Sequence, residues 1–195
     1  MFQPRFPLRP SAISSFLCER FPLFYLSCEH LIKTRHMKGQ HPMKEDVFTS
    51  IQDLPAPRSE VFPFFADPAN LEALTPAWLR FEVLTPRPLP RGEGACFDYR
   101  IRVRGLPLRW RTLIETFVPG ECFVDRQLSG PYALWHHTHT FEDLPSGGTR
   151  MTDTVRYSVG WGFLGTLATA LWVRRDIQKI FDYRKQVLAR MFPGK

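Results

Sequence analysis

The stretch ACFDYRIRVRGLPLRWRTLIETFV, residues 95–118, alternates apolar and polar side chains on both sides of a Gly-Leu-Pro turn. One face of its first half carries four apolar side chains, Phe97, Tyr99, Ile101 and Val103. A period of two residues is typical of a strand buried on one face. Because a short turn can join only antiparallel neighbours, the stretch predicts an antiparallel pair of strands, 95–104 and 108–118.

Similar segments separated by short turns lie on both sides of this pair. The further predicted strands are Asp46–Gln52, Phe81–Leu84, Cys122–Leu128, Tyr132–Phe141 and Thr149–Val159. Successive short strands joined by short turns favour an antiparallel sheet of about six or seven strands.

Helices are expected after the first strand and at the C-terminal end. Ser59 can cap a short helix that runs to Phe65, and a second short helix begins at Asp67 or Ala69 and ends at Pro76. From Leu164 to Met191 the apolar residues recur every three or four positions, which predicts an amphipathic helix of about seven turns. The fold class is therefore α+β: the long helix covers a curved sheet, encloses a space, and two short helices close one end.

The first 42 residues differ from the rest of the chain. They carry six basic and two acidic side chains and five prolines, with no sustained apolar period. We interpret residues 1–42 as a poorly ordered extension and residues 43–195 as one domain. Three origins stay open for the extension: a true start at Met43, a native tail, or a targeting segment.

A net charge of +7 and a sequence pI near 9.5 first suggest anionic partners. Much of that charge lies in the extension, and the basic row Arg100, Arg102 and Arg104 shares its strand face with Asp98 and with no aromatic stacking platform. The sequence therefore predicts no nucleic-acid partner and at most peripheral membrane contact, around Trp161, Phe163 and Leu164. None of the four cysteines has metal-ligand spacing, so they are interpreted as small buried residues in a reducing, cytoplasmic compartment.

Several motifs along the chain resemble one known group of proteins. They are Leu54-Pro55-Ala56-Pro57, the run Glu60 to Leu71 (EVFPFFADPANL), Leu74 to Leu79 (LTPAWL), Gly105 to Trp110 (GLPLRW), Phe123 to Gln127 (FVDRQ), Gly130-Pro131-Tyr132 with Trp135 to Phe141 (WHHTHTF), and Gly147 to Asp153 (GGTRMTD). Over about residues 44–192 the chain resembles the START-like or SRPBCC superfamily, in its polyketide cyclase/dehydrase-like and coenzyme Q-binding-like subgroup.

The resemblance implies a helix-grip fold with an apolar pocket between the sheet and the C-terminal helix. It also implies a hydrophobic small-molecule ligand, lipid-, quinone- or polyketide-like. No cofactor is expected. The residues expected to contact this ligand are Phe97, Tyr99, Trp110, Gln127, Tyr132, Trp135, His137, Tyr157, Leu171 and Phe181.

Two other functions stay open. A cyclase or dehydratase would need a base in the pocket, for which His137 with Asp125 is the candidate pair; Asp125 falls opposite His136 or His137, depending on a register that the sequence leaves undetermined. A partner-binding accessory module would need a large exposed apolar patch. The oligomeric state is undetermined.

The same strands carry residue types that bind metal ions. His137 and His139 could reach one ion, with Asp125 or Asp153 adding an oxygen, but no Cys or Glu-x-x-His motif supports them, so no metal site is predicted. If the face of Asp153 points inward, its carboxylate needs a partner, and the candidates are Arg109, Arg111 and Arg184.

Overall fold

The computed structural model describes residues 45–159 and 172–194, and its centre is a seven-stranded sheet in the order β1-β7-β6-β5-β4-β3-β2. The strands are β1 Asp46–Leu54, β2 Glu82–Val83, β3 Cys96–Val103, β4 Leu106–Val118, β5 Cys122–Ser129, β6 Leu134–Asp143 and β7 Thr149–Ser158. Every neighbouring pair is antiparallel. The predicted antiparallel sheet is confirmed.

The strand order has one long connection. From β2 to β7 each strand pairs with its neighbour in the chain, whereas β1 pairs with β7, from Asp46 opposite Tyr157 to Leu54 opposite Thr149. The chain therefore crosses from one edge of the sheet to the other between β1 and β2. The short helices lie on this crossover.

The tip of the β3–β4 pair is tighter than the sequence suggested. Val103 pairs with Leu106, so the turn consists of Arg104 and Gly105, whose φ angles are 52° and 85°. Two residues with positive φ form the turn that matches the twist of antiparallel strands. The turn thus lies one residue earlier than the predicted Gly105-Leu106-Pro107.

Three short helical segments follow β1: the α-helix α2, Arg58–Ala66, and the 3₁₀ turns η1, Pro68–Asn70, and η2, Ala77–Leu79. The predicted cap at Ser59 is wrong, because α2 begins at Arg58 after Pro57 and Ser59 lies inside it. The predicted second helix is a single 3₁₀ turn, in which the Asp67 side chain accepts the amide of Ala69 at 3.0 Å.

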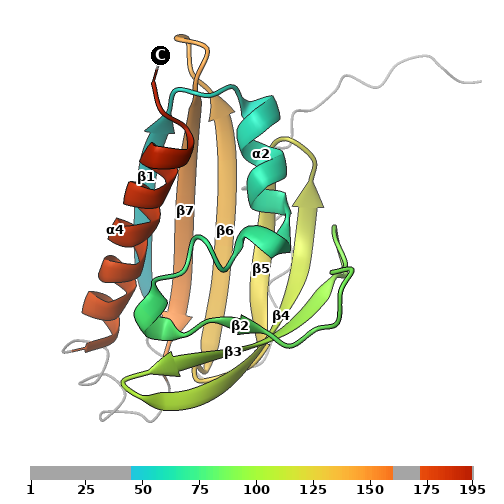
Figure 1. The fold of residues 1–195 in the computed structure, drawn as a ribbon, viewed down its shortest axis with the longest axis vertical. Helices are drawn as coiled ribbons and strands as arrows, with labels where there is room; N and C mark the ends of the chain where they lie inside the picture. The colour runs from blue at the N-terminus through green and yellow to red at the C-terminus, as the bar shows by residue number, and fades with distance from the viewer. Residues whose placement is uncertain (1–44, 160–171, 195) are drawn as a thin grey trace, which may run out of the picture.

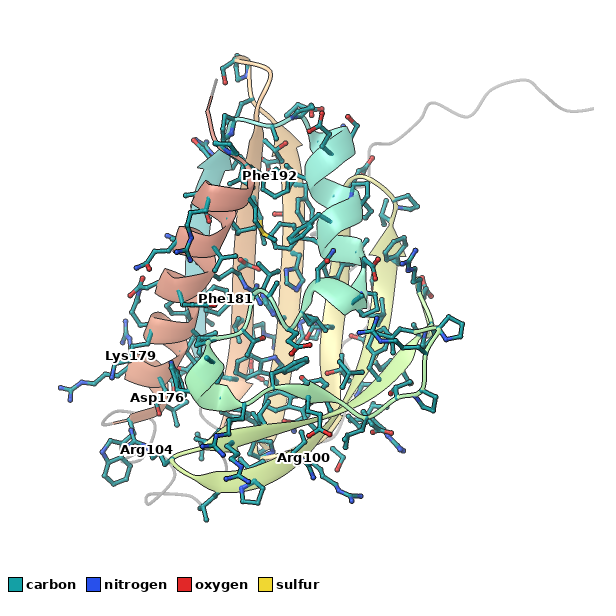
Figure 2. All side chains as sticks on the ribbon, viewed as in Figure 1. Arg100, Arg104, Asp176, Lys179, Phe181 and Phe192 are labelled. Carbon is teal, nitrogen blue, oxygen red and sulfur yellow. The ribbon has the colours of Figure 1, made fainter. Side chains whose placement is uncertain are left out.

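The C-terminal helix α4, Arg174–Met191, packs against β1, and α2 packs against β6 on the same face of the sheet (Figure 1). Phe181 lies on the sheet side of α4, whereas Lys179 points away from it (Figure 2). This arrangement is the expected helix-grip fold. The predicted first turns of this helix, Leu171, the proposed membrane contacts at 161–164 and the extension 1–42 lie outside the described residues.

Buried apolar side chains form two clusters between the sheet and the helices. The larger one joins α2 to the C-terminal part of α4 and includes Phe62, Phe141 and Leu188; the smaller one contains Tyr157 and Phe181. Cys122 is buried as expected, but Cys96 is an exposed free thiol, because strand alternation turns it away from the buried Phe97. In the described part of the chain, no helix is long and apolar enough to cross a membrane.

Candidate functional site

A cavity of about 590 Å³ lies between the sheet, α4 and the crossover segment around residues 64–81. Its walls come from β3, β4, β5, β6 and α4, and most of the lining side chains are apolar or aromatic. Seven of the ten expected ligand contacts line it: Phe97, Tyr99, Trp110, Tyr132, Trp135, His137 and Phe181. The inward strand faces therefore agree with the alternation in the sequence.

The other three expected contacts have different places. The Gln127 side chain holds the β5–β6 turn, since its Nε2 donates to the Tyr132 carbonyl at 2.7 Å and its Oε1 accepts the Tyr132 amide at 3.4 Å. Tyr157 is 1% exposed and packs in the smaller core cluster rather than lining the cavity. Leu171 lies outside the described residues.

A polar cluster interrupts the apolar wall at the centre of the sheet. The register places Asp125 on β5 opposite His137 on β6, and His139 on β6 opposite Asp153 on β7. Of the two registers that the sequence left open, the structure selects Asp125 with His137. Strand alternation then points His137 and His139 to the same, inward side.

Each imidazole of this cluster lies between the two carboxylates. Asp153 Oδ1 is 2.8 Å from His137 Nε2 and 2.7 Å from His139 Nδ1, although the second contact lacks hydrogen-bond geometry. Asp125 Oδ2 is 2.9 Å from His139 Nε2 and 3.4 Å from His137 Nδ1. The ring centroids of His137 and His139 are 3.8 Å apart.

Arg184 of α4 completes the cluster from the helix side. Its Nη1 is 3.4 Å from Asp153 Oδ1, and its guanidinium lies 4.9 Å from the ring centroid of Phe181. The expected pairing of an inward Asp153 is therefore met by Arg184, whereas Arg111 pairs with Asp98 on the outer face at 2.7 Å.

Burial and charge act against each other in this cluster. Burial opposes ionisation of Asp153, but the charge of Arg184 and the hydrogen bond from His137 outweigh it and hold the pKa of Asp153 well below its usual range. Burial and the neighbouring His139 lower the pKa of His137. For His139 the contacts with Asp125 and Asp153 outweigh burial, and its pKa is raised.

The sequence analysis considered His139, Asp153 and Arg184 as possible metal or ion-pair residues but did not include them among the expected ligand contacts. The signals were present, because His139 shares a strand face with His137, and Arg184 lies on the apolar stripe of the C-terminal helix between Phe181 and Leu188. What the sequence lacks is the register that brings three strands and one helix to the same point.

Aromatic side chains form another part of the cavity wall. Trp110 stacks on Tyr99 with centroids 5.7 Å apart and meets the edges or faces of Tyr132 and Trp135 at 5.5 and 5.2 Å. The Tyr99 hydroxyl lies 3.2 Å from Thr112 Oγ1. Burial raises the pKa of both the Tyr99 and the Tyr132 phenol well above the usual value.

The raised pKa values of Tyr99 and Tyr132 predict a loss of stability at alkaline pH. Burial raises the pKa of both phenols in the folded state. Their contribution to the free energy of unfolding is therefore complete below the unfolded phenol pKa of about 10 and falls as pH rises above it. We expect Tyr99 and Tyr132 to ionise only as the chain unfolds, measured by phenolate absorbance alongside circular dichroism. Tyr132→Phe should make the alkaline decline shallower. Titration of all five tyrosines near pH 10 in folded protein would contradict this.

Arginines of β3, β4 and the turn between them form ion pairs. Arg100 bonds Glu82, Arg111 bonds Asp98, and Arg104 reaches Asp176 at 3.2 Å across the lower end of α4 (Figure 2). Two arginines of the basic row, Arg100 and Arg104, thus have carboxylate partners within the fold.

Comparison with solved structures finds the same architecture in proteins of low sequence identity. Protein TTHA0849 from Thermus thermophilus is 16% identical, with a TM-score of 0.59 over 75% of this chain and 99% of that one. The Zhui aromatase/cyclase from Streptomyces sp. R1128 is 15% identical, with a TM-score of 0.56 over 78% and 100%. Norcoclaurine synthase from Thalictrum is 12% identical, with a TM-score of 0.57 over 78% and 99%.

No curated protein sequence matches the chain. The family model described as polyketide cyclase / dehydrase and lipid transport matches residues 54–179, which span the sheet from the end of β1 and the first turns of α4. That match covers well over half of the chain and includes most of the cavity walls and most of the polar cluster. The chain therefore belongs to the polyketide cyclase/dehydrase and lipid transport family.

Proposed function

We propose that this protein binds a hydrophobic small molecule, lipid-, quinone- or polyketide-like, in the cavity between the sheet and α4. The observation that carries the proposal is the cavity of about 590 Å³, with apolar and aromatic walls and a single polar cluster among the lining residues of its β5–β6 wall. Sites for small molecules commonly have this composition, in which apolar burial supplies affinity and a few polar groups fix orientation.

Two parts of the cavity wall would contribute differently. The rings of Tyr99, Trp110 and Trp135 offer edges and faces to a flat or unsaturated part of the ligand. Asp125, His137 and His139 offer hydrogen bonds to an oxygen of the ligand. A ligand with an apolar body and a carbonyl or hydroxyl group would satisfy both.

Native mass spectrometry of the purified chain, followed by organic extraction, tests the proposal directly. We expect a bound apolar compound, or stoichiometric uptake of added quinones, fatty acids or aromatic polyketides. A chain that takes up none of these classes would overturn the proposal.

Filling the cavity should abolish binding. Ile101 is 8% exposed and lines the cavity, so Ile101→Trp places an indole in the volume that the ligand would use, and we expect affinity to fall at least about tenfold. Ile51 on β1 is 53% exposed and does not line the cavity, so Ile51→Trp is the matched control. Equal affinities for the two folded variants, measured by fluorescence titration, would place the ligand elsewhere.

A second candidate function is catalysis on the same ligand, of the cyclase or dehydratase kind. It is favoured by the His137 imidazole, which lines the cavity and has Asp125 3.4 Å from its Nδ1. Incubation of the protein with aromatic polyketide precursors, followed by mass spectrometry, tests it. Loss of water from the substrate in the presence of wild type but not of His137→Gln is the expected result, and equal conversion by both would exclude this role.

A further inference from the structure

We propose that Asp125, His137 and His139 form a binding site for a divalent transition-metal ion, such as Zn²⁺, in the wall of the cavity. The three side chains come from neighbouring positions of β5 and β6 and each can offer one ligand atom, with all three atoms within 4.8 Å of one another. Two imidazoles and one carboxylate are a donor set that zinc and iron ions use in proteins, with a position left open for water or substrate.

The distances fit such an ion. Asp125 Oδ2 lies 3.4 Å from His137 Nδ1 and 2.9 Å from His139 Nε2. Ligand bonds of about 2.0–2.1 Å in a tetrahedral site separate neighbouring ligand atoms by about 3.3 Å. The Asp125–His137 separation has this value and the Asp125–His139 separation is slightly shorter, while all three ligand atoms lie within 4.8 Å of one another.

The other nitrogen of each ring has the surroundings expected around a metal ligand. His137 Nε2 and His139 Nδ1 both face Asp153 Oδ1, at 2.8 and 2.7 Å. Histidines that ligate a metal usually direct their second nitrogen to a carboxylate, which fixes the tautomer and the ring orientation. Asp153 would therefore be a positioning residue, held in turn by Arg184 at 3.4 Å.

The charge of the cluster and its access to the cavity also favour a metal ion at this site. Two carboxylates, Asp125 and Asp153, stand against one guanidinium, Arg184, so the cluster can hold one more positive charge, either a proton on an imidazole or a metal ion. Asp125, His137 and His139 line the cavity, whereas Asp153 does not. An open coordination position would thus face the volume assigned to the ligand.

Isothermal titration of the chelator-treated full-length chain with ZnCl₂ tests the site without any hydrophobic ligand, so its outcome is independent of the proposed function. We expect one tight site per chain, and Co²⁺ in its place should give visible absorption bands. Asp125→Ala should lose this site, and Asp153→Asn should weaken it about 10–100-fold. His136→Gln is the matched control, because His136 is the neighbouring histidine of β6 and points to the opposite face, where it pairs with Glu115.

Imidazole nitrogen chemical shifts of the wild-type chain keep the proposal testable if a variant fails to fold. Zn²⁺ should shift His137 Nδ1 and His139 Nε2 as directly bound nitrogens, while His136 stays unchanged. The proposal is overturned if Zn²⁺ does not bind, if it shifts only His30, His36 and His41 of the N-terminal extension, or if Asp125→Ala binds as tightly as wild type.

Discussion

Replacing Asp153 with alanine should lower the free energy of unfolding by about 3–5 kcal/mol, the usual cost of removing one partner from a buried ion pair. The Asp153 side chain is 6% exposed and contacts Arg184, whose own side chain is 12% exposed. Without the carboxylate, the guanidinium stays buried without its ion-pair partner, and His137 loses its 2.8 Å hydrogen bond. Urea denaturation followed by circular dichroism measures the change.

The matched control is Asp53→Ala on β1. Asp53 also pairs with an arginine, Arg150, at 2.7 Å, but both side chains are 46% exposed. Water and salt screen exposed pairs, so this variant should unfold close to wild type. Equal losses in the two variants would show that burial of Asp153 is not what makes its pairing important.

The architecture was predictable because the signals for it are local. Alternation along Phe97 to Val103 indicates a strand with one buried face, and the three- and four-residue spacing near Phe181 and Leu188 indicates an amphipathic helix. An antiparallel sheet and one long helix leave few ways to bury both apolar faces. Helix starts were less predictable, as the misplaced cap at Ser59 shows. The N-cap position of α2 is occupied by Pro57, which makes no side-chain hydrogen bond to the helix.

The polar cluster depends on relations that a sequence does not contain. Asp125 and His137 are opposite each other only in one of two registers, and those registers place opposite faces of β6 inward. Arg184 meets Asp153 because α4 packs against β1, whose neighbour in the sheet is β7. The individual residues were visible as candidates, and their assembly into one cluster required the three-dimensional arrangement.

The cluster is also costly for a fold that would otherwise have a continuous apolar interior. Charged groups in a buried site lose hydration, and well-packed apolar residues of similar volume are often at least as stabilising. The cluster lies on the cavity wall rather than in the filled core around Phe141 and Leu188. This placement supports a role for it in ligand or metal binding more than in stability.

The filled core around Phe141 predicts the second large effect. Phe141 on β6 is 2% exposed, and its ring lies 5.3 Å from Phe62, 5.4 Å from Phe65 and 6.1 Å from Phe123. Because these rings come from α2 and β5, they are held by separate elements and cannot close the space left by Phe141→Ala. The expected loss is about 3–5 kcal/mol of unfolding free energy.

Thermal unfolding should show that loss as a midpoint lowered by about 6–20 °C, since each kcal/mol shifts a domain of this size by about 2–4 °C. Phe192→Ala is the comparison, because Phe192 is only partly buried at the end of α4 (Figure 2), and among the described residues its one ring contact is Phe64 at 5.5 Å. A terminal ring leaves a space that solvent can fill, so its loss should cost clearly less. If Phe192→Ala destabilised the chain as much as Phe141→Ala, the end of α4, rather than the α2–β6 contact, would hold the larger core cluster together.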